Sequence, residues 1–155
     1  MKVLMVCLGN ICRSPLAEGI LKHKTKKKKI YVDSAGTSSY HIGKLPDRRS
    51  IEIANKYGID ISDQRARQFS VVDFDRFDKI YAMDIHNINS IISIARNQSD
   101  RNKVDLILNE INPNSFDNIP DPYYGDGDGF QKVFNMLNEA CDLIAKKLWK
   151  KGNYI

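Results

Sequence analysis

Short runs of β-branched and aliphatic residues alternate along the chain with segments of helical periodicity. Four of these runs predict strands, because polar or turn residues bound each one: 2–6, 30–34, 79–83 and 104–108. Their nearly continuous apolar character is typical of parallel strands that are covered on both faces. We therefore expect a four-stranded parallel sheet, with ligands bound at the carboxyl ends of the strands.

Helical periodicity fills the intervals between these runs. Apolar positions at three- and four-residue spacing predict three helices, which include residues 16–21, 51–57 and 130–148. Gly58 is placed to close the second helix, and Asp84 to cap a further helix that runs to about Arg96. Ser70 with Asp73 resembles a capping box before a short helix. This β-α-β order predicts an α/β fold with helices on both faces of the sheet.

The length of 155 residues suits a single domain over 1–155 that buries its core without disulfides. No apolar stretch approaches the roughly 20 residues needed to cross a bilayer, so we expect no membrane insertion. The apolar run at 3–8 is shorter than the core of roughly 7–15 residues in a secretory signal. Three cysteines, an odd number, indicate free thiols rather than a disulfide framework. Together these features predict a cytoplasmic protein.

The net charge of +5 is concentrated in one lysine-rich run, KHKTKKKK at Lys22–Lys29. Lysines at the end of a helix complement its dipole and remain in water, and we expect this role for the run. A surface that tracks phosphates is the alternative. Because no aromatic residue is interleaved with the lysines and no nucleic-acid-binding motif accompanies them, we expect no nucleic-acid partner.

The segment VCLGNICRSP, residues 6–15, directly follows the first predicted strand. Pro15 suits the first position of a helix and Ser14 the N-cap, so a short loop should join the strand to the start of a helix. Backbone N–H groups and the helix dipole make such a loop an anion-binding site. The same positive field stabilises a thiolate, which makes Cys7 a candidate nucleophile.

Arg13 lies six positions after Cys7. A loop curled around a tetrahedral anion can place the guanidinium group on two phosphate oxygens while the Cys7 sulfur sits below the phosphorus. Gly9 permits a strained backbone and Asn10 tolerates the left-handed region, as such a curl requires. Ser14 can cap the helix or donate to the thiolate. The sequence therefore predicts a phosphate-binding loop after the first strand.

A long polar loop at 109–129, rich in Pro and Gly, holds a second candidate group. Long irregular loops in compact domains are commonly functional. A phenolate-like oxygen is a poor leaving group unless an acid protonates it, and a carboxyl group on such a loop, Asp121, suits that role. This chemistry requires neither a metal nor a cofactor. Without the Cys7 loop, Asp121-Pro122 would indicate an ordinary turn.

VCLGNICRSP resembles the phosphate-binding loop of the low-molecular-weight protein tyrosine phosphatases, and DPYYG at 121–125 resembles their general-acid loop. The similarity extends over nearly the whole chain and includes VDSAGT at 32–37, RARQF at 65–69 and AMD at 82–84. The resemblance implies hydrolysis of phosphotyrosine through a phosphocysteine intermediate. Cys7 would be the nucleophile, Arg13 would bind phosphate, and Asp121 would be the general acid and base. Phosphotyrosine-containing proteins would be substrates, and inorganic phosphate or other oxyanions would be inhibitors.

Supporting roles also follow from the resemblance. Asn10, Ser14 and Ser34 would hold the loop in shape through hydrogen bonds. The positions that correspond to those lining or flanking the substrate cleft are Leu8, Ile11, Tyr40, Tyr123 and Tyr124. The chain departs from the family pattern at Gln64, where many relatives carry a histidine.

Two other activities stay open. A phosphoarginine phosphatase is one, although the resemblance implies that such enzymes favour Thr where this chain has Ile11. The other is a phosphoryl carrier, which would also use a cysteine at the end of a strand. A carrier that does not turn over has no need of Arg13 together with an acid.

Cys12 lies in the same loop as Cys7 and suggests redox regulation. An accessible thiolate is prone to oxidation, and a neighbouring cysteine can trap its sulfenic acid as a disulfide. We expect peroxide to produce a reversible Cys7–Cys12 disulfide that stops activity, as the family resemblance also favours. The alternative is that Cys12 only fills space behind the loop.

Overall fold

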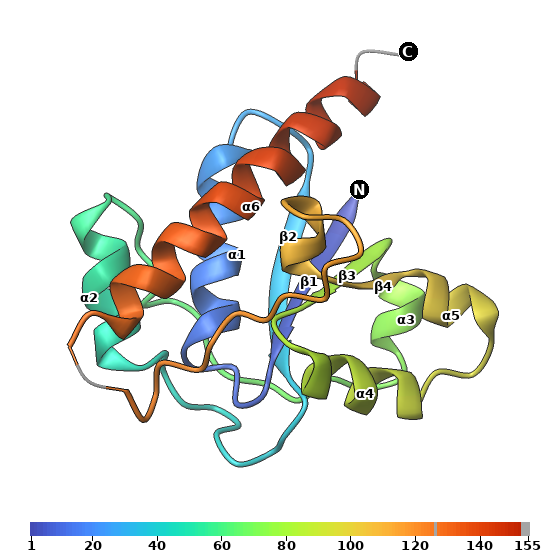
Figure 1. The fold of residues 1–155 in the computed structure, drawn as a ribbon, viewed down its shortest axis with the longest axis horizontal. Coiled ribbons are helices and arrows are strands. Elements are labelled where there is room, and N and C mark those ends of the chain that lie inside the picture. The colour runs from blue at the N-terminus through green and yellow to red at the C-terminus, as the bar shows by residue number, and fades with distance from the viewer. Residues whose placement is uncertain (126, 153–155) are drawn as a thin grey trace.

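A central parallel sheet with helices on both faces forms the protein, shown as a computed structural model in Figure 1. The structure describes residues 1–125 and 127–152. Asp126 of the predicted 109–129 loop and the last three residues of the predicted domain lie outside the described residues.

The sheet has four strands in the order β2-β1-β3-β4, and every neighbouring pair is parallel. The strands are β1 (Lys2–Cys7), β2 (Tyr31–Gly36), β3 (Lys79–Ala82) and β4 (Val104–Leu106). The predicted α/β fold is therefore confirmed. The first strand lies in the interior of the sheet, so the residues that follow Cys7 emerge between the ends of β2 and β3.

Within residues 1–125 and 127–152, seven helical segments connect the strands or follow them. They are α1 (Arg13–Lys24), α2 (Arg48–Lys56), α3 (Asp73–Arg76), α4 (Ile85–Ser93), α5 (Gln98–Asn102), a 3-10 turn at Ile107–Glu110 and α6 (Gly129–Gly152). Asp84 caps α4 as predicted, in a full capping box with Asn87. The helix ends at Ser93 rather than near Arg96, because Asn97 already caps the next helix, α5.

The predicted capping box of Ser70 and Asp73 forms only in part. The Ser70 N–H donates to Asp73 Oδ2 at 2.9 Å, but α3 begins after Val72, and Val72 makes no side-chain cap bond. Both carboxylate oxygens of Asp73 also accept hydrogen bonds from the Arg67 guanidinium. This buried ion pair orients the carboxylate and ties α3 to the segment that precedes it.

Alternate residues of β1 face opposite layers, as the twofold repeat of a strand requires. Val3 and Met5 lie in one core with apolar residues of α1, α2 and α6. Leu4 and Val6 lie in a second core with residues of α3 and α4. Figure 1 shows α1 and α2 to the left of the sheet and α3 and α5 to its right, with α4 at the lower right and α6 running diagonally from the lower left to the upper right. Burial on both faces holds β1, and with it Cys7, firmly in place.

The lysine-rich run begins inside α1 and continues into the following loop. Lys22, His23 and Lys24 form the last turn of the helix, which confirms the expected placement of basic residues at its C-terminus. Lys24 pairs with Asp142 of α6 at 2.6 Å, and the Lys28 ammonium lies 3.7 Å from the centre of the Trp149 ring. None of the described helices has the length and apolar character needed to span a membrane.

Candidate active site

The loop after β1 leads directly into α1, but the helix begins earlier than the sequence predicts. Cys12 occupies the N-cap position without a side-chain cap bond, and Arg13 is the first helical residue. The predicted cap, Ser14, lies inside the first turn, and Pro15 follows it. The prediction for these two residues is wrong because the Ser14 hydroxyl has another partner. Its Oγ lies 3.0 Å from the Cys7 sulfur.

A left-handed residue and a close backbone approach create the curl of the loop. Asn10 has φ +56, as predicted for that position. Gly9 does not have a positive φ, and it is needed for another reason. A Cβ atom there would lie 2.9 Å from Cδ2 of His41. Gly36 at the end of β2 is more tightly constrained, because its Cβ would lie 2.7 Å from the Leu8 carbonyl oxygen, which is a backbone atom, whereas the His41 ring is a side chain that can move.

Four carbonyl groups of the loop point outward and accept hydrogen bonds from the surrounding segments. The acceptors are Cys7, Leu8, Ile11 and Cys12, and the respective donors are the N–H groups of Thr37, Ser38 and Asp47 and the hydroxyl of Ser50. In a trans peptide the N–H points opposite to the carbonyl. The N–H groups of residues 8, 9, 12 and 13 therefore point toward the inside of the loop, where an anion would be stabilised.

The sulfur of Cys7 lies at the floor of this hollow. The residue is 3% exposed, and its Sγ accepts a hydrogen bond from the Asn10 N–H at 3.3 Å. The Ser14 hydroxyl approaches it from the helix. These two contacts fix the position of the sulfur at the base of the hollow.

Arg13 is buried beside the same hollow and is held by several acceptors. Its NH1 donates to Asp84 Oδ2 at 2.6 Å and to the Ile119 carbonyl at 2.9 Å, while NH2 lies 3.6 Å from Asp121 Oδ2. Burial alone would lower the pKa of this guanidinium, but Cys7, Asp84 and Asp121 together raise it. The Arg13 guanidinium group is thus a positive charge held in a fixed position next to the Cys7 sulfur.

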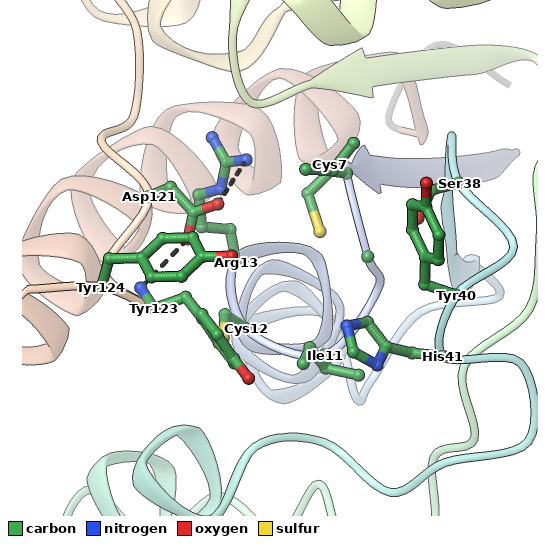
Figure 2. Close-up of a pocket in the computed structure, with 12 residues that line it drawn as sticks. Cys7, Ile11, Cys12, Arg13, Ser38, Tyr40, His41, Asp121, Tyr123 and Tyr124 are labelled. Atoms are coloured by element: carbon green, nitrogen blue, oxygen red, sulfur yellow. Dashed lines mark hydrogen bonds and ion pairs between the residues drawn. The ribbon is translucent and has the colours of Figure 1, made fainter.

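A cleft of about 360 Å³ opens above Cys7 and Arg13. Figure 2 shows Asp121, Tyr123 and Tyr124 on one side of it and Tyr40 and His41 on the other, with the Cys7 sulfur directed between them. The structure brings all the predicted cleft residues together, and Tyr40 and Tyr124 are largely exposed. Such rings can form the walls of a slot for a planar aromatic group.

The sequence model of a known family, low molecular weight phosphotyrosine protein phosphatase, matches this chain over residues 2–154. The chain belongs to this family. A phosphatase of the same name from Schizosaccharomyces pombe is 41% identical over 152 residues, which cover 95% of this chain and 96% of the relative. The protein is therefore a cysteine-based tyrosine phosphatase, as predicted.

Solved structures agree with the fold of this phosphatase. A protein tyrosine phosphatase from Entamoeba histolytica, described with Hepes in the active site, superposes with a TM-score of 0.89 at 36% identity, covering 98% of this chain and 99% of the other. A Drosophila arginine phosphatase superposes with a TM-score of 0.85 at 35% identity, covering 96% and 98% of the two chains. The fold alone is therefore compatible with more than one phosphorylated residue type.

Hydrogen bonds support the phosphatase loop from behind. Asn10 Nδ2 donates to Ser14 Oγ at 2.8 Å and to Ser34 Oγ at 2.9 Å, so the three predicted supporting residues do lie together. Gln64 does not join this group. Its Nε2 donates to the Pro15 carbonyl at 3.1 Å, within the first turn of α1.

Cys12 also lies in the loop of the phosphatase and contributes to the cleft lining. Cys7, Cys12 and Cys141 are all free and buried. Burial is the main cause that raises the pKa of the Cys12 thiol far above its ordinary range, and the nearby negative charges of Asp47 and Cys7 raise it further. The thiolate form of Cys12 is therefore scarce at neutral pH.

Several residues of the site were not found from the sequence. Asp84 was recognised only as a helix cap, yet its two oxygens serve two partners: Oδ1 accepts from the Asn87 N–H, and Oδ2 accepts from Arg13. Arg49 of α2 donates to the Tyr123 carbonyl at 3.2 Å and lies 4.6 Å from the centre of the Phe130 ring. No sequence signal identified Arg49, because its contact with the Tyr123 carbonyl joins residues 74 positions apart.

Proposed function

We propose that Cys7, Arg13 and Asp121 carry out phosphotyrosine hydrolysis in this phosphatase. The Cys7 thiolate attacks phosphorus, an S–P bond forms, and the bond from phosphorus to the tyrosine oxygen breaks. Asp121 gives its proton to that oxygen as it leaves. The observation that carries this proposal is the placement of the Asp121 carboxylate 3.6 Å from the buried Arg13 guanidinium, at the mouth of the Cys7 loop.

The second step releases phosphate. Water attacks the phosphocysteine, Asp121 accepts a proton from the water, and the S–P bond breaks to return the thiolate. In both steps Arg13 and the inward N–H groups of the loop stabilise the negative charge that develops on the phosphoryl oxygens. These donors are fixed in advance, because the outward carbonyls anchor the loop to its surroundings.

The walls of the cleft favour a phosphotyrosine side chain. Tyr40 and Tyr123 can contact the faces of an aromatic ring, while Leu8 and Ile11 supply apolar surface near the base of the cleft. A short aliphatic phosphoester would leave these surfaces uncovered and would hold its phosphorus less well against Cys7. Phosphotyrosine-containing proteins are therefore the proposed substrates.

Inorganic phosphate and other tetrahedral oxyanions are proposed as competitive inhibitors, because they fit the same donors without a leaving group. Hepes, which carries a sulfonate, is described in the active site of the Entamoeba relative. We also propose that the protein acts in the cytoplasm, where reducing conditions keep thiols such as Cys7 and Cys12 free.

Steady-state hydrolysis tests the proposal and its alternatives together. Phosphotyrosine, phosphoserine, phosphoarginine and an aryl phosphate are compared in excess chelator, with kcat/KM measured for each. The proposal predicts continuous turnover and the largest kcat/KM for phosphotyrosine. A larger value for phosphoarginine would indicate an arginine phosphatase, and release of one phosphate per protein without turnover would indicate a carrier.

A further inference from the structure

A buried carboxylate lies behind the phosphate-binding loop, on the face of α1 that contacts β2. The Glu18 side chain is only 4% exposed. Its Oε1 accepts a hydrogen bond from Ser34 Oγ at 2.7 Å, and its Oε2 accepts one from Lys22 Nζ at 2.6 Å. Burial raises the pKa of Glu18, whereas Lys22 and then Ser34 lower it. Burial prevails, so the pKa of Glu18 lies above its ordinary value, and Lys22 is the cation that opposes this shift.

A series of hydrogen bonds connects Glu18 to Cys7 through Ser34, Asn10 and Ser14, and the direction of each bond can be assigned. Asn10 Oδ1 accepts from the Arg67 N–H at 3.0 Å, which fixes the orientation of the amide. Its two Nδ2 protons are then donated to Ser34 and Ser14. Each hydroxyl already accepts from Asn10, so its own proton must go elsewhere.

For Ser34 that acceptor is Glu18, at 2.7 Å. For Ser14 it is the Cys7 sulfur at 3.0 Å, with the Ala35 carbonyl as a longer alternative at 3.4 Å. A negative charge at one end of the series thus directs the Ser34 hydroxyl away from Asn10. This leaves Asn10 free to donate to Ser14, whose proton can stabilise the thiolate at the other end.

We propose that Lys22, which lies outside the cleft, is a positioning residue for Cys7 and acts through Glu18, Ser34, Asn10 and Ser14. Half of the Lys22 side chain is exposed while its partner Glu18 is buried, so the pair connects the protein surface to the residues behind Cys7 without touching substrate. The inference rests on the proposed role of Cys7 and adds a residue to its support. Gln64 contacts the Pro15 carbonyl instead and does not substitute for Lys22 in this series.

Loss of the Lys22 charge favours the reverse direction for the bond between Glu18 and Ser34. Without its cation, the buried Glu18 carboxylate binds a proton more readily, and a proton on Oε1 makes it a donor toward Ser34. The Ser34 proton then has no acceptor in this series, because Asn10 Nδ2 offers only protons, and the hydrogen bond between Asn10 and Ser34 weakens. The Ser14 contact with Cys7 weakens as Asn10 shifts, and a smaller fraction of Cys7 is thiolate at a given pH.

The other charges near these groups stay in place in such a variant, including Asp63, which acts on Lys22 itself. Arg13 of α1 and Asp121 face Cys7. Asp33 of β2 acts on Glu18 and is paired with Arg67 at 3.0 Å. A change on removing Lys22 is therefore attributable to the Glu18 pair.

Alkylation of Cys7 tests this inference without using turnover. The rate of iodoacetamide modification is measured against pH for the full chain, with mass spectrometry confirming that Cys7 is the labelled thiol. For Lys22→Met we expect the midpoint pH of the alkylation profile to rise by roughly half a unit or more. Lys22→Arg should restore the wild-type profile, and Lys27→Met, which removes an exposed lysine outside the series, should match the wild type.

Thermal unfolding of the same variants separates positioning from simple destabilisation. A folded Lys22→Met protein with an unchanged alkylation midpoint would overturn the inference, even if its Tm is lower. If Lys22→Met does not fold, the alkylation midpoint of Lys22→Gln is measured instead, and an unchanged midpoint in that folded variant would also overturn the inference. Failure of the proposed catalytic role would look different, because Cys7→Ser would then retain phosphatase activity while the alkylation result for Lys22 could still hold.

Discussion

The Oδ2 atom of Asp121 lies 3.6 Å from the NH2 group of Arg13, whose NH1 group is bound to Asp84 at 2.6 Å. One buried guanidinium therefore joins a carboxylate from the long loop to a carboxylate at the start of α4. The contact with Asp84 fixes the orientation of the Arg13 guanidinium group. The weaker contact with Asp121 leaves that carboxylate, which is 37% exposed, free to meet a leaving group.

Replacement of Asp121 should slow substrates according to their leaving groups. We expect Asp121→Asn to lower kcat for phosphotyrosine by roughly 10²- to 10⁴-fold, because the phenolate then leaves without a proton. Substrates with strongly acidic phenols should lose much less. Stopped-time assays with a series of aryl phosphates measure this dependence, and equal losses across the series would exclude Asp121 as the acid.

Replacement of Asp84 should act on Arg13. Without its 2.6 Å partner, the guanidinium can turn toward Asp121, so the donors aimed at the phosphoryl group are misplaced. We expect Asp84→Asn to lower kcat/KM for good and poor leaving groups alike, by roughly 10-fold or more. Weaker inhibition by inorganic phosphate should accompany the loss. Unchanged phosphate inhibition would show that Asp84 does not position Arg13.

Cys7→Ser should abolish turnover, with a loss of roughly 10⁴-fold or more, as for other covalent nucleophiles. A serine hydroxyl stays protonated in this setting and is a far weaker nucleophile. Activity of the wild-type protein should be unaffected by excess chelator. Cys141→Ala removes a thiol buried against α1 and serves as the control that keeps activity. Dependence of the wild type on a metal would contradict the mechanism.

Peroxide should inactivate the protein reversibly. Peroxide oxidises the Cys7 thiolate to a sulfenic acid, and the Cys12 sulfur then attacks it, forming the S–S bond and releasing water. Because the Cys12 pKa is raised, its thiolate is scarce, and disulfide formation should accelerate as the pH rises through the neutral range.

Mass spectrometry should find the linked peptide that joins residues 7 and 12, and a dithiol should restore activity. Cys12→Ser should keep phosphatase activity but recover less after peroxide, because further oxidation of Cys7 is irreversible. Equal recovery of the variant and the wild type would defeat this prediction.

Acid should weaken the fold through Asp100. The Arg96 guanidinium donates hydrogen bonds to the Asp100 carboxylate, and the Arg96 backbone N–H donates another. These bonds, those of the guanidinium most of all, lower the pKa of Asp100 from its ordinary 3.8 to about 2. A carboxyl group with a lowered pKa in the folded state contributes stability above about pH 3.8, and loses that contribution as the pH falls toward 2. Urea unfolding of Asp100→Asn should show a flatter dependence on pH than the wild type between these values. Parallel profiles would contradict this assignment.

Contiguous features were predictable from the sequence, whereas contacts between distant segments were not. Cys7 and Arg13 lie in one ten-residue motif after an apolar strand, so local geometry was enough to place them in an anion site. Asp84 reaches Arg13 only because β3 pairs with β1, with Ala82 beside Val6. Glu18 lies among apolar positions of α1, and nothing local distinguishes a buried carboxylate from one in water.

Ser14 shows the same limit at short range. As a serine before proline it fits an N-cap, and only the position of Asn10 and the Cys7 sulfur moves it into the first turn. Tertiary hydrogen bonds here outweigh a local capping preference, whose contribution is about 1 kcal/mol.

The interior position of β1 couples the nucleophile to the cooperative unfolding of the whole domain. Amide groups of a strand paired on both sides exchange with solvent mainly when the molecule opens globally. The loop that begins at Cys7 is anchored to that strand and to the end of β2, so it cannot fray independently of the sheet. Denaturant should therefore unfold the sheet and disrupt the loop at the same midpoint, which makes the loss of phosphatase activity a gauge of the unfolded fraction.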